Sequence, residues 1–220
     1  MSRSTVTAIL SGIAIIGAGV AYLTLAVDLP PRTDGGIPRE IGRTVAAEAH
    51  KLASGPGDYI VIARDTSTFK QPAADLVLAS VLEEIRKSGG KISGVRAVEL
   101  DPLRPVLVPA SDFMDLIHSA PVGSVVISLM GPPLLTDEQR AQLGQINPKI
   151  VAFCSGNITG SGELQRLFDQ GLLHTAIVAR YLLEPVGSVE KSSPHLFGSQ
   201  YTVVTKPPAG GSKPGPGGQP

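Results

Sequence analysis

The sequence predicts an α/β domain with a mostly parallel sheet of five or six strands, preceded by one transmembrane helix at the amino terminus. Three observations lead to this prediction. Short apolar runs alternate with segments of helical periodicity along most of the chain. Residues 5–27 contain no charged side chain. The length of 220 residues is enough for one domain with a sizeable core and additional terminal segments.

The first part of the chain predicts a helix, a strand and a second helix. Residues 54–57 (SGPG) end the first helix, and 59–63 (YIVIA) is a continuous apolar run, typical of a strand buried on both faces. Pro72 suits the first turn of the next helix, which Ser88-Gly89-Gly90 should end. The first helix, over 39–53, places its apolar residues on one face: Ile41, Val45, Ala49 and Leu52.

The same alternation continues toward the carboxyl end. Ser111 is expected to cap a short helix, and Thr136 with Gln139 has the spacing of a capping box, which predicts the start of another. A further helix should run through Leu164 to Leu172. The remaining strands are expected at 95–100, 124–129, 150–153 and 176–179, with an edge strand at 201–204.

Strands that alternate with helices of this length predict right-handed crossovers and a Rossmann-like three-layer arrangement, with helices on both faces of the sheet. The carboxyl-terminal segment has five Pro and five Gly among its 15 residues, a composition that cannot bury a core; it is either a plain tail or a docking tail. The expected domains are residues 1–27 (transmembrane anchor or signal peptide), 28–57 (linker and amphipathic helix), 58–205 (α/β domain) and 206–220 (disordered tail).

The uncharged segment 5–27 is long enough to span a bilayer, because a helix rises about 1.5 Å per residue and the hydrocarbon layer is about 30 Å thick. A cleaved signal peptide, with a cleavage site at 24–26, and a buried core helix are the alternatives. The apolar part of a signal peptide usually has only about 7–15 residues, which favours a retained anchor.

The sidedness of the domain depends on two conflicting observations. The arginines that follow the uncharged segment closely outnumber Arg3 before it, and the positive-inside rule would then keep the domain in the cytoplasm. The short, charged amino terminus is instead typical of an export signal or a signal-anchor. We expect a single-pass membrane protein with an extracytoplasmic, periplasmic domain.

Composition excludes several classes of function. Lys+Arg and Asp+Glu are both 19, so the net charge is zero and a basic surface for nucleic acid is not expected. A lone cysteine, Cys154, excludes an internal disulfide and a Cys-rich zinc site. The four histidines are widely scattered, without the spacing of helical zinc ligands. We therefore expect no metal and no cofactor.

Ligands of open parallel sheets bind beyond the carboxyl ends of the strands. The residues expected there are mostly small, hydroxylated or amide-bearing, and suit hydrogen bonding to a polar solute or to a protein partner. Residues 156–163 are glycine-rich, but Glu163 stands where a phosphate-binding loop requires lysine. The candidate ligand-binding residues are Asp65, Thr66, Ser67, Phe69, Asp101, Ser155, Asn157 and Arg180.

A catalytic interpretation of the same loops stays open. Asp65 and Asp101 could form an acid and base pair across neighbouring strand ends, and Cys154 could act as a nucleophile if a basic group lowered its pKa. Their ordinary roles would be turn capping for the aspartates and core packing for the cysteine. The sequence contains no Gly-x-Ser-x-Gly elbow of the hydrolases.

Residues 59–157 resemble the first lobe of the type I periplasmic sugar-binding proteins. The matching segments are IVIARDTSTFKQPAADLVLASVLEEIRKSGGK, VRAVELD, SVVISLMGPP and KIVAFCSGN. The resemblance implies that Asp65 and Phe69, and also Asp101, contact a ligand. That family closes two lobes around its solute, and the residues after Asn157 are too few for a second lobe. Pairing with another subunit would complete the site.

These observations predict a membrane-anchored, non-catalytic binding or assembly module. It would be a subunit of a membrane-associated complex or a single-lobe relative of the periplasmic binding proteins. The expected partners are a protein or a membrane complex, together with a small polar ligand. A membrane-tethered hydrolase or transferase that uses Asp65, Asp101 or Cys154 is the first alternative. A purely structural subunit, which would use an apolar surface patch, is the second.

Overall fold

The computed structural model describes residues 17, 35–53, 57–99, 108–133, 135–143, 148–155, 161–180, 198 and 200–205. Residues 1–34 and 35–220 form separate compact units, and the second contains the sheet. Within these described ranges, no helix combines the length and the apolar character that a bilayer crossing requires. The predicted transmembrane helix, apart from Gly17, and the predicted tail lie outside the described residues.

The domain contains a six-stranded sheet with the order β2-β1-β3-β4-β5-β6. Neighbouring strands from β2 to β5 are parallel, and β6 pairs with β5 in the antiparallel direction. The prediction of a mostly parallel sheet with an edge strand near residue 201 is therefore confirmed. The strands are β1 (Asp58–Arg64), β2 (Lys91–Val98), β3 (Val125–Ser128), β4 (Lys149–Cys154), β5 (Thr175–Ala179) and β6 (Tyr201–Thr205).

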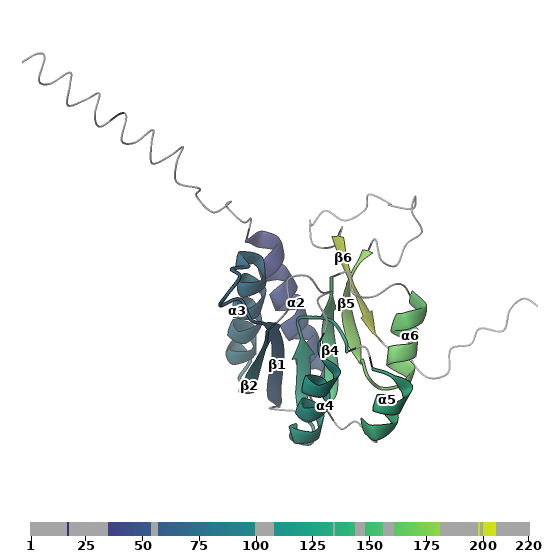
Figure 1. Cartoon of the computed structure of the whole chain (residues 1–220). Helices are drawn as coiled ribbons and strands as arrows, with labels where there is room; N and C mark the ends of the chain where they lie inside the picture. Colours follow the sequence, from purple (N-terminus) through teal and green to yellow (C-terminus); the bar gives the residue numbers. More distant parts are fainter. Residues whose placement is uncertain are drawn as a thin grey trace, which may run out of the picture. The chain divides into compact units, whose positions relative to one another are not determined.

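Five helices cover the two faces of this sheet in the described residues (Figure 1). One core cluster joins the first two helices to side chains such as Val61 and Ile127, and the other joins the last three to the opposite face through residues such as Ile62 and Val126. The predicted three-layer arrangement is thus confirmed. The helices are α2 (Gly36–Leu52), α3 (Pro72–Lys87), α4 (Ala110–Ser119), α5 (Asp137–Leu143) and α6 (Ser161–Asp169).

Two predicted helix ends are confirmed, at Thr136 and near Ser88, whereas the predicted cap at Ser111 is wrong and the first helix begins at Gly36 and not at residue 39. The backbone N–H of Thr136 donates to Gln139 Oε1 at 2.9 Å and that of Gln139 to Thr136 Oγ1 at 3.3 Å, which is the predicted capping box. Helix α3 ends at Lys87, and its C-cap Ser88 is followed by Gly89 at a φ of 78°. Ser111 does not cap α4: Pro109, extended with ψ 136°, occupies the cap position, so the helix begins at residue 110.

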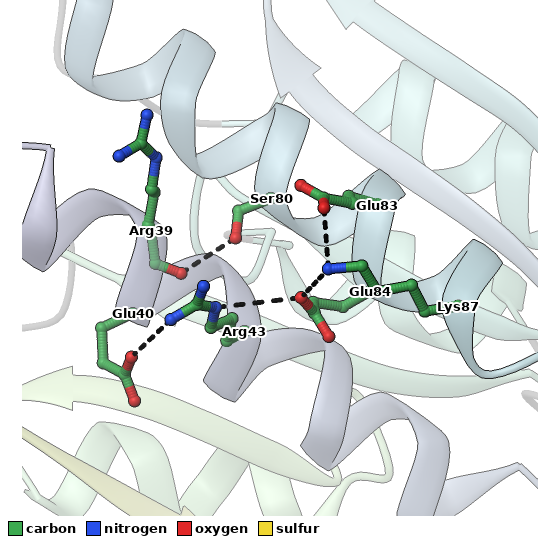
Figure 2. Close-up of polar contacts among 7 residues, drawn as sticks. All are labelled: Arg39, Glu40, Arg43, Ser80, Glu83, Glu84 and Lys87. Carbon is green, nitrogen blue, oxygen red and sulfur yellow. Dashed lines mark hydrogen bonds and ion pairs between the residues drawn. The ribbon is translucent and has the colours of Figure 1, made fainter.

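Helices α2 and α3 approach each other closely at a glycine. A Cβ added to Gly42 would lie 2.6 Å from the Cβ of Ser80 and 2.7 Å from the carbonyl oxygen of Val77, so only glycine allows this backbone separation. At the same place the hydroxyl of Ser80 donates to the carbonyl oxygen of Arg39 at 2.9 Å (Figure 2). This bond satisfies a polar group that the contact buries.

Ion pairs lie on the outer side of the same contact. Arg43 of α2 approaches Glu84 of α3 at 3.8 Å and Glu40 of its own helix at 3.6 Å, while Lys87 contacts Glu84 at 3.1 Å (Figure 2). Glu84 is half-buried and the other three side chains are exposed, and ion pairs near the surface contribute only about 0–1 kcal/mol. The apolar packing and the close approach at Gly42 therefore dominate the contact.

We predict that Gly42→Ala lowers the free energy of unfolding by about 1–3 kcal/mol, because the new methyl group must push α2 away from Ser80 and Val77. Gly162→Ala in α6 is the matched control, since a Cβ there meets no atom within 4 Å and alanine favours a helix by up to about 1 kcal/mol. Urea denaturation followed by circular dichroism measures both. Equal stability of the Gly42→Ala variant and the wild type would contradict the proposed close contact.

Candidate functional site

The direction in which successive strands are added to the sheet reverses between β1 and β3. From β1 the chain crosses through α3 to β2 on one side, and it then returns through α4 to β3 on the other side of β1. In open parallel sheets, ligands bind at the carboxyl ends of the strands where the order reverses. The loop that begins at Asp65, after β1, and the loop that begins at Leu129, after β3, flank this point.

Asp65 presents an ionised carboxylate at the end of β1. Its backbone N–H still donates to the carbonyl oxygen of Val98 at 2.8 Å, so the sheet fixes its position. Its Oδ1 accepts a hydrogen bond from the backbone N–H of Ser67 at 2.8 Å. Hydrogen bonds from Ser67, and the positive charge of Lys70, lower the pKa of Asp65 below its ordinary value. The group is therefore a hydrogen-bond acceptor at neutral pH and not a proton donor.

Thr66 ties the same loop to helix α3. Its hydroxyl donates to Oδ1 of Asp75 at 2.6 Å, and Asp75 lies in the first turn of α3, where a negative charge is favourable. Sequence reasoning missed Asp75, although an acidic residue three positions after Pro72 is a recognisable sign of a helix start. Phe69 lies further along the loop with 53% of its surface exposed. The loop thus combines an anchored carboxylate with an accessible aromatic ring.

The loop after β3, which lies next to the loop of Asp65, is apolar and well fixed. The hydroxyl of buried Ser128 donates to the carbonyl oxygen of Gly131 at 2.5 Å and accepts the backbone N–H of Met130 at 3.4 Å. Gly131 has a φ of 84°, which a larger residue would rarely adopt. Met130 and Pro132 are buried. This loop therefore packs against the domain and supports the switch point without adding a charged group.

The other candidate residues lie elsewhere along the edge. Ser155 is exposed directly after β4, and Arg180 is partly buried directly after β5. Because neighbouring strands are about 4.8 Å apart, the ends of β4 and β5 lie about 10 and 14 Å from the end of β1. The fold thus groups Asp65, Thr66, Ser67 and Phe69 in one loop and separates them from Ser155 and Arg180. Asp101 and Asn157 lie outside the described residues.

Cys154 has the environment of a core residue. It is fully buried, and its Sγ lies 3.8 Å from the carbonyl oxygen of Ala152. Burial, with a smaller effect of the negative charge of Glu163, raises the pKa of this thiol to about 12. A nucleophilic cysteine needs the opposite shift. Cys154 is therefore unsuited to act as the nucleophile of the hydrolase or transferase considered above. In the described part of the chain, no group of three or more metal-binding side chains comes together.

No protein-family model and no curated protein matches this chain. Solved structures do resemble it. The arabinose-binding protein AraP from Geobacillus stearothermophilus is 17% identical, with a TM-score of 0.50 over 77% of this chain and 61% of that one. A solute-binding protein of an ABC transporter from Burkholderia graminis, in complex with D-arabinose, is 18% identical with a TM-score of 0.50 over 77% and 60%. A sugar-binding protein from Bacillus halodurans is 18% identical, with a TM-score of 0.50 over 76% and 62%.

These similarities confirm the resemblance to the type I periplasmic sugar-binding proteins at the level of the fold. They cover a longer part of the chain than residues 59–157, from which the resemblance was inferred. The chain spans about three fifths of the length of these structures, which corresponds to one lobe. At identities below 20% the shared fold alone is established. The function must be argued from the residues.

We predict that native Cys154 reacts very slowly with thiol reagents. With a pKa of about 12, roughly one thiol in ten thousand is ionised at pH 8, and burial also blocks access. Labelling with a maleimide, followed by mass spectrometry, should give little product in the folded protein and complete reaction in urea. Rapid labelling of the folded chain at pH 7 would show that the thiol is accessible and would revive its catalytic interpretation.

Proposed function

We propose that this protein is a membrane-tethered, non-catalytic binding module whose loop after β1 binds a small, hydroxyl-rich solute. The observation that supports this most strongly is the position of Asp65 and Phe69 in one loop beside the point where the strand order reverses. A protein partner completes the site from the open side. The domain lies on the extracytoplasmic, periplasmic side of the membrane.

The chemistry of the loop suits a sugar. The carboxylate of Asp65 is ionised, and it keeps acceptor positions for solute hydroxyl groups beyond its bond from Ser67. The exposed ring of Phe69 offers an apolar face to the C–H groups of a sugar ring. One solved structure of similar fold holds D-arabinose, which makes an aldopentose a reasonable first probe.

The single lobe supports the proposed partner. A binding site normally surrounds most of its ligand, whereas one lobe contacts a solute from one side only. A solute held by a half-site should therefore bind weakly, with a dissociation constant on the order of 1 mM. A second protein surface that covers the solute would raise this affinity. Such a partner fits an assembly subunit better than a free solute carrier.

The proposed tether is the uncharged segment 5–27. Its length supports a retained transmembrane helix, since about 20 residues span the hydrocarbon layer. The similarity of the fold to periplasmic solute-binding proteins supports an extracytoplasmic domain.

We predict that Asp65→Asn and Phe69→Ala each weaken D-arabinose binding at least about tenfold, because one removes the charge of the acceptor and the other the stacking surface. Saturation-transfer NMR on the full-length chain measures this weak binding. Asp169→Asn and Val122→Ala are matched controls. Both residues are exposed, and each lies shortly before the start of a strand, Asp169 before β5 and Val122 before β3. They are therefore at the edge of the sheet opposite the loop of Asp65.

The controls should retain wild-type binding, and all four variants should keep the wild-type circular dichroism spectrum. The solute site would be refuted if the wild type bound neither D-arabinose nor any other aldopentose or aldohexose. Equal binding of D-arabinose by the wild type and all variants would also refute it. Affinity purification from solubilised membranes tests the partner separately.

We predict that the chain stays in the membrane pellet after carbonate extraction, because a transmembrane helix resists alkaline washing that removes peripheral proteins. External protease should then digest the α/β domain on spheroplasts while leaving a cytoplasmic marker intact. Release of the chain into the supernatant, with an amino terminus near Val27, would show instead that the segment is a cleaved signal peptide.

A further inference from the structure

Two hydrogen bonds connect the carboxylate of Asp65 with helix α3. The hydroxyl of Thr66 donates to Oδ1 of Asp75 at 2.6 Å. The backbone N–H of the next residue, Ser67, donates to Oδ1 of Asp65 at 2.8 Å. Because Thr66 and Ser67 are joined by one peptide bond, the position of Thr66 limits where the N–H of Ser67 can lie. The first turn of α3 therefore influences the group on which the proposed solute site depends most.

The bond between Thr66 and Asp75 is suited to hold this loop. Its length is that of a strong hydrogen bond between a hydroxyl group and an ionised carboxylate. Asp75 is itself fixed, since its backbone N–H donates to the carbonyl oxygen of Gln71 at 3.0 Å where α3 begins. The bond joins residues nine positions apart in the sequence and so closes the loop onto the helix.

The sheet holds Asp65 from the other direction, but only by its backbone. The N–H of Asp65 donates to the carbonyl oxygen of Val98 at 2.8 Å, which fixes the main chain at the end of β1. The side chain could still rotate among its staggered conformations. The bond from Ser67 selects one of them. Without that bond, Asp65 would keep its place in the fold but lose the fixed direction of its carboxylate.

We propose that Asp75 is a positioning residue of the solute site: through Thr66 and Ser67 it sets the direction of the Asp65 carboxylate, and it does not touch the solute. The effect on binding rests on the proposed function, whereas the effect on Asp65 can be measured without a solute. A carboxylate that already points in one direction loses less conformational freedom when a ligand binds. The affinity for the solute should therefore depend on Asp75.

Substitutions can separate two properties of the Asp75 side chain. Its negative charge in the first turn of α3 is favourable to the helix, and its oxygen accepts the bond from Thr66. Asp75→Asn removes the charge and keeps an acceptor oxygen, whereas Asp75→Ala removes both. The difference between these two variants therefore measures the bond alone. Thr66→Val removes the donor from the other side of the bond and changes no charge.

The titration of Asp65 in the full-length chain, followed by NMR of its carboxyl group, tests the connection directly. Hydrogen bonds from Ser67 are the main cause of the lowered pKa of Asp65, and the charge of Lys70 contributes less. Asp75→Ala and Thr66→Val should therefore raise this pKa toward its ordinary value. Loss of the negative charge of Asp75 acts in the opposite direction, so a rise in Asp75→Ala reports the lost bond. In Asp75→Asn the pKa of Asp65 should stay low.

Binding of D-arabinose, measured by saturation-transfer NMR, should follow the same order. Asp75→Ala and Thr66→Val should each raise the dissociation constant about three- to tenfold, and the double variant should be little worse than either, because both changes break one bond. Asp75→Asn should recover most of the binding that Asp75→Ala loses. Glu83→Ala is the control, since it removes an exposed carboxylate near the other end of α3. It should leave the titration of Asp65 and the binding unchanged.

The outcomes distinguish this proposal from the solute site itself. If the wild type binds no sugar while Asp65 titrates as expected in the variants, the solute site is refuted and the positioning of Asp65 by Asp75 is supported. An unchanged pKa of Asp65 in both Asp75→Ala and Thr66→Val would overturn the positioning role. Equal loss of binding in Asp75→Asn and Asp75→Ala would also overturn it, because the charge of Asp75 would then act on the solute directly. Circular dichroism checks that every variant is folded.

Discussion

The structure depends on the need to bury both faces of a parallel sheet. Strands such as β3 and β5 are apolar on both sides, so each face requires a layer of helices. On one face α3 lies against the edge formed by β1 and β2, and α2 contacts β3, β4 and β5. The helix before β1 is therefore part of the core. Its close contact with α3 at Gly42 makes the two helices one layer.

This layering also decides where a ligand could bind. Helix α3 lies on one face and α4 on the other, so the chain changes direction across the sheet between β1 and β3. The first two residues of the loop after β1 are fixed, Asp65 by its bond to Val98 and Thr66 by its bond to Asp75 of α3. Residues that are already fixed lose little conformational entropy when a ligand binds. Such preorganisation raises the affinity for the ligand.

Much of the fold could be predicted from the sequence because strand and helix patterns are local. The apolar runs at 59–63 and 176–179 and the capping box at Thr136 are properties of short segments, and the structure bears them out. Strand order depends on long-range packing and was not predictable. It determines that Ser155 lies apart from Asp65. The prediction that Ser111 caps α4 was wrong because Pro109 is the N-cap residue and the helix begins at Ala110.

The antiparallel direction of β6 has a practical consequence. Thr205, at its end, lies beside Thr175, the first residue of β5, and therefore at the edge of the sheet opposite the loop of Asp65. A biotin or affinity tag fused after Thr205 would begin on the side remote from that loop. Immobilising the protein through its carboxyl end should orient the binding loop toward the solution, which suits surface-based measurements of weak interactions.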